Sequence, residues 1–188
     1  MLELLAPAGN LDAVIAAVQN GADAVYMGFG DGFNARRSAD NFTRESFAKA
    51  VRYCHIRGCK VYVTLNTLVG DREMDAAAAL AQQASDAGAD AILVQDLGLA
   101  RVLRAALPDI PLHASTQMSI HNLAGVEAAA EMGITRAVLA RELSLEQIRF
   151  ISQHASIETE VFVHGALCFC HSGQCYICLL YTSDAADE

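Results

Sequence analysis

The chain has 188 residues, of which 53% are hydrophobic and 19% charged, enough for one domain with its own core. No run approaches the roughly 18 consecutive apolar residues of a membrane span, and the first residues lack the basic start of a signal peptide, so we expect a cytoplasmic protein without a membrane anchor. The net charge of -9 would repel a phosphate backbone, so this segment alone is not expected to grip nucleic acid.

A repeated unit organises the chain: a short apolar strand, a polar loop, an amphipathic helix and a glycine before the next strand. The junction at residues 21–25 recurs at residues 88–92, and each glycine suits a helix end that needs positive φ. The pattern predicts seven strands, around residues 4–5, 25–27, 61–65, 92–94, 112–115, 137–139 and 161–163.

Apolar residues recur with the helical period between these strands, for example over residues 11–18, 47–54 and 99–106. Helix start signals agree with that period. They are the predicted N-caps Asn10, Thr43 and Asn122 and a capping box over residues 144–147. Strands that alternate with helices, without a hairpin signal, predict an α/β fold with a parallel sheet. Seven units favour an incomplete (β/α) TIM-type barrel without an eighth strand, and an open doubly wound sheet is the alternative.

Polar side chains follow several of the predicted strands. In a parallel barrel the carboxyl ends of the strands meet at one face, where active sites form. We therefore expect these side chains to converge on one mouth: Asn66, Asp96, Ser115, Gln117, Arg141, Glu142 and His164.

The fifth predicted strand carries an alternating polar row of His113, Ser115 and Gln117, which we expect on one face. Burying such a row of polar side chains costs free energy unless they bind a ligand or form hydrogen bonds within the protein, and both interpretations stay open. Arg141 beside Glu142 is either an ion pair or an anion clamp for a carboxylate-bearing substrate. The candidate catalytic residues are His113, Gln117, Arg141, Glu142 and His164.

A glycine-rich stretch at residues 28–32 resembles a phosphate-cradling loop, but no helix opens at once and no acidic partner for a ribose follows. A loop over the barrel mouth is therefore favoured. Arg36 and Arg37, just after it, could meet an anionic group, although a solvated loop is the simpler interpretation.

The six cysteines do not form the pattern of a secreted disulfide framework, so we expect reduced thiols. Cys54 lies on the apolar face of a predicted helix and Cys59 leads a predicted strand, which favours small core residues over ligands. Residues 164–175 instead crowd three thiols and two imidazoles together. Such groups hold soft metals or iron-sulfur clusters, and thiolates are also nucleophiles.

Two other chemistries are open for this crowded segment. Zinc could take Cys168, Cys170, His171 and Cys175, although that spacing is not a familiar finger or ribbon. A thiol protease would use Cys168 as nucleophile with His164 or His171 as base, oriented by Glu142 or Gln117.

Several segments resemble the collagenase-like peptidase family U32: LLAPAGN (4–10), GADAVY (21–26), HASTQ (113–117), VFVHGALC (161–168) and SGQC (172–175). The resemblance runs from Met1 to about residue 177. It implies an incomplete barrel over residues 1–177, with further segments downstream that this chain lacks. The resemblance to this family also implies an enzyme, because members are named as peptidases and other branches look like oxidoreductases.

Those oxidoreductase branches hydroxylate a tRNA or ribosomal RNA base, with a prephenate-type hydroxyl donor, or hydroxylate a quinone ring without oxygen. Several hold an iron-sulfur cluster. Carried over by position, Cys168 and Cys175 match the first two cluster cysteines, so they are the expected cofactor-binding and metal-binding residues. The resemblance therefore favours an RNA-base hydroxylase that meets RNA or a small molecule through the missing segments. A cysteine-type peptidase and a quinone-ring hydroxylase are the alternatives, and Cys170 is read as a bystander.

The last residues, 178–188, break the family pattern and resemble translated sequencing-adapter DNA. We therefore expect a non-native tail there, in which Cys178 is not biological. This segment is excluded from the fold prediction.

Overall fold

The computed structural model of the chain describes residues 2–30, 32–35, 41–165 and 170–174. Several residues singled out by the sequence fall outside these ranges, and so does the expected non-native tail at residues 178–188. They are Arg36, Arg37, Cys168, Cys175 and Cys178.

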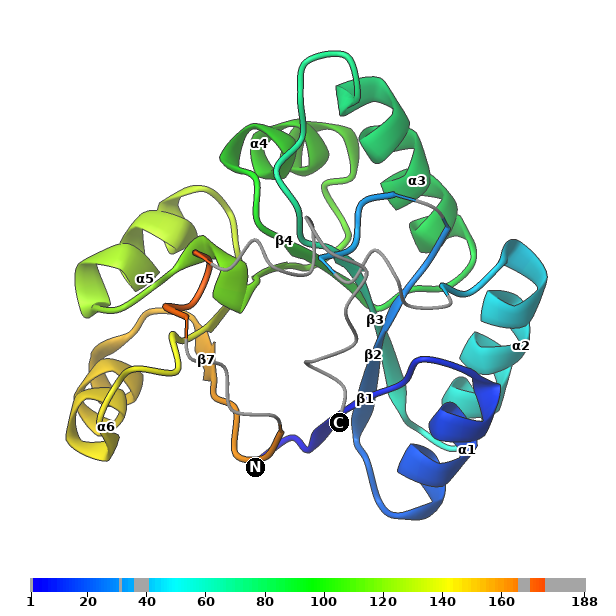
Figure 1. Cartoon of the computed structure of the whole chain (residues 1–188), viewed down its shortest axis with the longest axis horizontal. Coiled ribbons are helices and arrows are strands. Elements are labelled where there is room, and N and C mark those ends of the chain that lie inside the picture. Colours follow the sequence, from blue (N-terminus) through cyan, green and yellow to red (C-terminus); the bar gives the residue numbers. More distant parts are fainter. Residues whose placement is uncertain (1, 31, 36–40, 166–169, 175–188) are drawn as a thin grey trace.

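Seven parallel strands form one sheet whose spatial order follows the sequence. The strands are β1 (Leu5–Pro7), β2 (Ala24–Gly28), β3 (Lys60–Leu65), β4 (Ala91–Val94), β5 (Leu112–Ala114), β6 (Arg136–Val138) and β7 (Glu158–Glu160). The sheet curls, and the helices cover its outer side (Figure 1). This confirms the incomplete TIM-type barrel, because an open doubly wound sheet would reverse its strand order partway.

In the described part of the chain, six α-helices connect consecutive strands. They are α1 (Leu11–Gln19), α2 (Arg44–His55), α3 (Met74–Asp86), α4 (Leu97–Ala106), α5 (Leu123–Glu131) and α6 (Leu145–His154). The predicted N-caps are confirmed, since the side chains of Asn10, Thr43 and Asn122 each accept a hydrogen bond from the backbone amide three residues on. The capping box of Ser144 and Gln147 is also present. The glycines that precede β2 and β4 have positive φ, as predicted.

The core has two layers. On the outer side, β-strand residues such as Val61, Val63 and Leu65 pack against helix residues such as Phe47 and Leu103. On the inner side a smaller cluster fills the barrel. It consists of Ala24, Tyr62, Ala91, Leu93 and Val138. Successive side chains of β3 therefore point alternately into the outer and the inner layer of the core.

Cys54 and Cys59 are both buried in the outer layer, which confirms that they are core residues. Burial raises the pKa of the Cys54 thiol to about 12 and also raises that of Cys59. Both remain neutral thiols at physiological pH.

The seventh strand does not lie where the apolar pattern predicted. The strand is Glu158–Glu160, whereas residues 161–163 are irregular and exposed, with Val163 84% accessible. Among the described residues β7 pairs only with β6, so residues 161–163 lack the second neighbour that would bury them. The prediction of a buried strand at 161–163 was therefore wrong by three residues, although the number of strands was right.

Candidate functional site

A chain of polar contacts links the loops that follow β2, β3 and β5. Asn34 Nδ2 donates to Asn41 Oδ1 at 3.1 Å, within the segment after β2. Asn66, which directly follows β3, accepts from the backbone amide of Ala35 at 3.0 Å and donates to Ser115 Oγ at 3.3 Å. The carboxyl ends of these strands therefore share one hydrogen-bonded rim.

A second set of contacts fixes residues 170–174 against the loop after β6. Ser172 is fully buried, and its amide donates to Glu142 Oε1 at 2.7 Å. Its hydroxyl accepts from the backbone amide of Arg141 at 3.1 Å, and its carbonyl accepts from Ser119 Oγ. Ser172 thus makes hydrogen bonds to the loop after β5, through Ser119, and to the loop after β6, through Arg141 and Glu142.

The next residue, Gly173, has to be glycine at this position. Its φ is +78°, in the left-handed region that side chains with a Cβ rarely adopt. A Cβ there would also overlap the carbonyl oxygen of Gln117 and the hydroxyl of Ser119. The close approach of residues 170–174 to the loop after β5 depends on this missing side chain.

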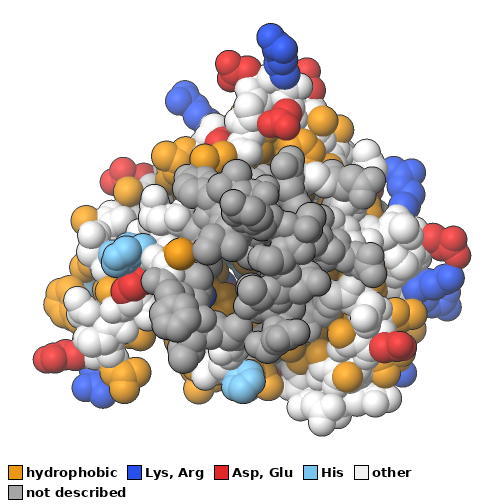
Figure 2. Space-filling model, in the orientation of Figure 1, with side chains coloured by type: hydrophobic (Ala, Val, Ile, Leu, Met, Phe, Trp, Pro, Cys, Tyr) orange, Lys and Arg blue, Asp and Glu red, His pale blue; other side chains and the backbone are white. Residues whose placement is uncertain are grey.

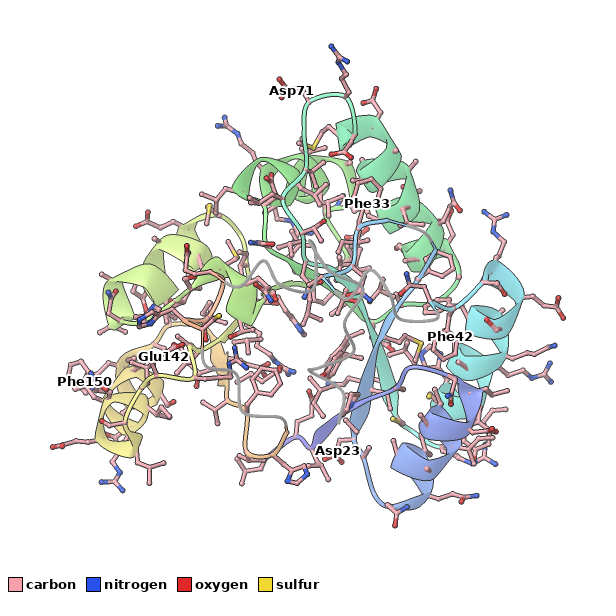
Figure 3. All side chains as sticks on the ribbon, in the orientation of Figure 1. Asp23, Phe33, Phe42, Asp71, Glu142 and Phe150 are labelled. Carbon is pink, nitrogen blue, oxygen red and sulfur yellow. The ribbon has the colours of Figure 1, made fainter. Side chains whose placement is uncertain are left out.

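His121, Glu142 and His171 lie together beside this anchor, with one ligand-type atom from each within 4.8 Å of the others. His121 Nε2 is 3.4 Å from Glu142 Oε2. Glu142 lies on the side of the molecule that carries α5 and α6, and Figure 3 labels it. Figure 2 shows histidine surface next to acidic surface on the same side of the molecule.

Glu142 is a carboxylate in this setting. Partial burial acts to raise its pKa, but the hydrogen bond from the Ser172 amide and the nearby His121 hold the pKa below its ordinary value. A pair of imidazoles beside a carboxylate can bind a cation or transfer protons.

Of the predicted catalytic residues, Arg141 and Glu142 are brought together with Ser172. They do not form the ion pair with each other that was one alternative, because Glu142 pairs with His121 and Arg141 donates to Ser172.

Gln117 does not continue the face of β5, contrary to the prediction. The strand ends at Ala114, and Ser115 caps the 3₁₀ helix η1 (Thr116–Met118), accepting from the Gln117 amide at 3.3 Å. Gln117 therefore belongs to a helical turn and not to the strand that carries His113. The alternation of polar residues predicted a continuous strand and gave no sign that the strand ends before Gln117.

Two further predicted mouth residues have different surroundings. Asp96 caps α4, with Oδ1 accepting from the Leu99 amide at 2.8 Å, so its role is structural. His164 is exposed and follows the irregular residues 161–163, and no ion pair or hydrogen bond joins its side chain to the other described residues of the mouth.

His113 lies toward the opposite end of the barrel. It is buried, and its ring meets the ring of Tyr62 edge-on at a centroid distance of 4.9 Å. Burial, reinforced by the Arg136 charge, lowers the pKa of His113 to about 3, so the imidazole is neutral. Its Nδ1 has no hydrogen-bond partner among the described residues. His113, one of the candidate catalytic residues, therefore lies at the end of the barrel that carries Arg136 and not beside Glu142.

Around His113, charged residues at the amino-terminal ends of the strands form a network that we call the barrel floor. Arg136 donates to Glu3 and, at 2.9 and 2.7 Å, to Glu158. Glu3 also accepts from Lys60 at 2.9 Å and from Tyr62 at 2.8 Å. A cavity of about 540 Å³ opens at this end of the barrel, and its lining includes Lys60, Tyr62, His113, Arg136 and Glu158.

Sequence reasoning did not single out His121, Ser119 or Ser172. His121 follows η1 and directly precedes the N-cap Asn122, so it read as an ordinary loop residue. Its proximity to Glu142 depends on how the loops after β5 and β6 meet, which no local pattern encodes.

Comparison with known proteins agrees with this fold. The chain is 44% identical over 187 residues to the 23S rRNA 5-hydroxycytidine C2501 synthase of Escherichia coli, covering all of this chain and 28% of that protein. It is 41% identical over 175 residues to the tRNA hydroxylation protein P1 of Bacillus subtilis, covering 93% of this chain and 41% of that protein. The chain thus spans less than half the length of either relative.

A solved structure described as a U32 peptidase superposes with a TM-score of 0.74 at 19% identity, covering 90% of this chain and 71% of that one. Among the described residues, no helix has the length and apolar character needed to cross a membrane. The sequence pattern of Peptidase family U32 matches residues 9–188. The chain therefore belongs to Peptidase family U32.

Proposed function

We propose that this chain is the barrel part of an enzyme that hydroxylates a base of tRNA or ribosomal RNA, with an iron-sulfur cluster and a prephenate-type hydroxyl donor. The observation that carries the proposal is the burial of Ser172 against Arg141 and Glu142. Ser172 lies between Cys168 and Cys175 in the sequence, so its anchoring supports a role for that cysteine loop at the barrel mouth. The names of the two relatives support RNA as the substrate.

Hydroxylation of a base is an oxidation, which explains why cysteines that bind a redox cluster would be needed. Replacing a C–H bond of the base by C–OH, with a donor that supplies hydroxide, releases one proton and two electrons, so an electron acceptor is required. A bound iron-sulfur cluster carries one electron at a time, so it would pass the two electrons in turn to an external electron acceptor. Cys168 and Cys175 would provide two of its about four thiolates, the others coming from outside this chain. Cys54 and Cys59 do not suit that role, because burial keeps them protonated.

The other candidate residues are assigned to the substrate or the donor. Arg141 is exposed beside Ser172 and suits an anionic group, such as a donor carboxylate. Gln117 and His164 belong to loops that follow strand ends, where a base would approach. With a net charge of -9 the chain repels RNA. We therefore assign most contacts with the RNA phosphate backbone to segments outside this chain. We place the enzyme in the cytoplasm, where its proposed substrates are.

The test compares cells that lack the gene encoding this chain with cells that carry it. Mass spectrometry of nucleosides from ribosomal RNA and tRNA should show a hydroxylated base that disappears on deletion. The base should return with the wild-type gene and not with Cys168→Ser or Cys175→Ser. Cys54→Ala is the matched control, because it removes a core thiol, and it should restore the base.

The same protein, purified without oxygen, should contain iron and sulfide that both cysteine variants lose. An unchanged nucleoside profile overturns the RNA assignment. Iron-free protein whose peptide cleavage depends on Cys168 would favour the peptidase alternative instead.

A further inference from the structure

His121, Glu142 and His171 bring together the ligand types of a transition-metal site. Neutral imidazole nitrogens and a carboxylate oxygen bind zinc and other divalent first-row metals, and no thiolate is needed. Their ligand-type atoms lie within 4.8 Å of one another, on the loops after β5 and β6 and on the segment fixed by Ser172. Three elements far apart in the sequence thus contribute one ligand each.

The distance between the first two ligands fits a shared ion. Two atoms that each lie about 2.0–2.1 Å from a tetrahedral zinc are about 3.3 Å apart. His121 Nε2 and Glu142 Oε2 are 3.4 Å apart. His171 is exposed, so its ring can rotate the short distance needed to complete the set.

Both of these ligands are also oriented by outer contacts of the kind that metal sites use. His121 Nδ1 is 2.6 Å from the carbonyl oxygen of Ser119, which fixes the proton on Nδ1 and leaves the lone pair of Nε2 toward Glu142. Glu142 Oε1 accepts from the Ser172 amide, which leaves Oε2 for a cation. Ser119 has a φ of 57°, rare for a residue with a side chain, and such local strain clusters at functional sites.

We propose that the chain binds one divalent transition-metal ion through His121 Nε2, Glu142 Oε2 and a ring nitrogen of His171, with at least one coordination position open to solvent. The three ligands are partly or largely accessible, so an ion can enter and a water or substrate oxygen can complete its shell. This ion is separate from the cluster assigned to Cys168 and Cys175, and its binding requires neither that cluster nor RNA.

The first measurement uses the whole chain carrying both Cys168→Ser and Cys175→Ser, which removes the proposed cluster ligands and the thiolate zinc alternative. After chelator treatment, competitive titration with Zn²⁺ should show one ion per chain. Co²⁺ should give visible d–d bands without the near-ultraviolet charge transfer of a thiolate. A result with no binding, or with thiolate charge transfer from Cys170, overturns the proposal.

Single variants in the same background then identify the ligands. His121→Ala and His171→Ala should each weaken Zn²⁺ binding by at least about 100-fold, the upper end of what loss of an outer contact causes. His154→Ala is the matched control, because His154 is also exposed and also directs Nδ1 to a backbone carbonyl, at 2.7 Å from Phe150 O, but lies outside the cluster. Equal affinities for all three variants would show that His121 and Glu142 are only an ion pair.

Circular dichroism and urea unfolding of each variant separate ligand loss from loss of the fold. A variant that unfolds is replaced by His121→Asn or His171→Asn, which keep a polar side chain at the position. Because Cys168 and Cys175 are replaced in all of these proteins, failure of metal binding leaves the RNA proposal standing, and an unchanged RNA profile leaves the metal site standing.

Discussion

The two ends of this barrel use charged residues in opposite ways. At the floor, Arg136 is shared by Glu3, Glu158 and Glu160, and its side chain is only 10% exposed. At the mouth, the Glu142 and His121 side chains are 28% and 39% exposed and face each other beside the solvent. In TIM-type barrels the amino-terminal face serves stability and the carboxyl-terminal face serves chemistry. At the floor one buried guanidinium is thus shared by three carboxylates of the same chain, whereas the charged groups of the mouth are more accessible to a ligand.

The largest expected effect is at the floor. Replacing Arg136 with Met removes the cation that compensates Glu3 and Glu160, and breaking such a buried pair costs about 3–5 kcal/mol of unfolding free energy. Urea unfolding measures this cost. Glu158→Gln is the control, because that side chain is 68% exposed and its loss should cost less than about 1 kcal/mol. Equal losses of unfolding free energy in the two variants would contradict the view that the buried charge of the floor stabilises the fold.

The second effect is a pH dependence of the unfolding free energy, which His113 of the floor should produce. The pKa of His113 is about 3 in the fold and 6.5 in its absence, so the unfolded chain binds the proton first as the pH falls. The contribution of His113 is full above pH 6.5 and is lost progressively toward pH 3, by about 2 kcal/mol between pH 6.5 and 5.

His113→Gln should remove this part of the slope when unfolding free energy is measured from pH 7 to pH 4. The carboxylates of the floor also titrate in acid, and the difference between wild type and variant subtracts them. Parallel curves for the two proteins would mean that His113 has the same pKa in the fold as in the unfolded chain, which contradicts the lowered pKa.

A smaller effect separates structural from functional residues at the mouth. Asp96→Ala should cost about 1 kcal/mol, because the N-cap of α4 loses its hydrogen bond to the Leu99 amide. Zn²⁺ affinity should stay as in the parent, since Asp96 is outside the group of His121, Glu142 and His171. A loss of Zn²⁺ binding in Asp96→Ala would extend the site to the loop after β4.

The smallest change in global stability is expected at Gly173. Gly173→Ala should displace residues 170–174 from η1. Because the displacement opens this segment without unfolding the sheet, we expect it to lower the global unfolding free energy by only about 1 kcal/mol. Hydrogen exchange of the Ser172 amide should become faster, and Zn²⁺ binding should weaken with it. Gly9→Ala is the control, because an added methyl group there meets nothing within 4 Å.

The sequence by itself determined the repeated strand-helix unit, the parallel sheet and the helix starts. These features depend on local signals: the apolar period, the capping side chains of Asn10 and Asn122, and glycines that accept positive φ. The same signals placed Arg141 and Glu142 in the loop after the sixth strand, at the carboxyl end of the sheet.

Only the tertiary structure decided which of those polar residues meet. His113 belongs to the floor because β5 pairs it with Arg136, and Asp96 caps a helix because α4 begins at the next residue. His121 and His171 are 50 positions apart and carry no shared local pattern, yet the burial of Ser172 brings them to one carboxylate. Contacts between loops depend on the curvature of the whole sheet, and periodicity along one segment contains no information about that curvature.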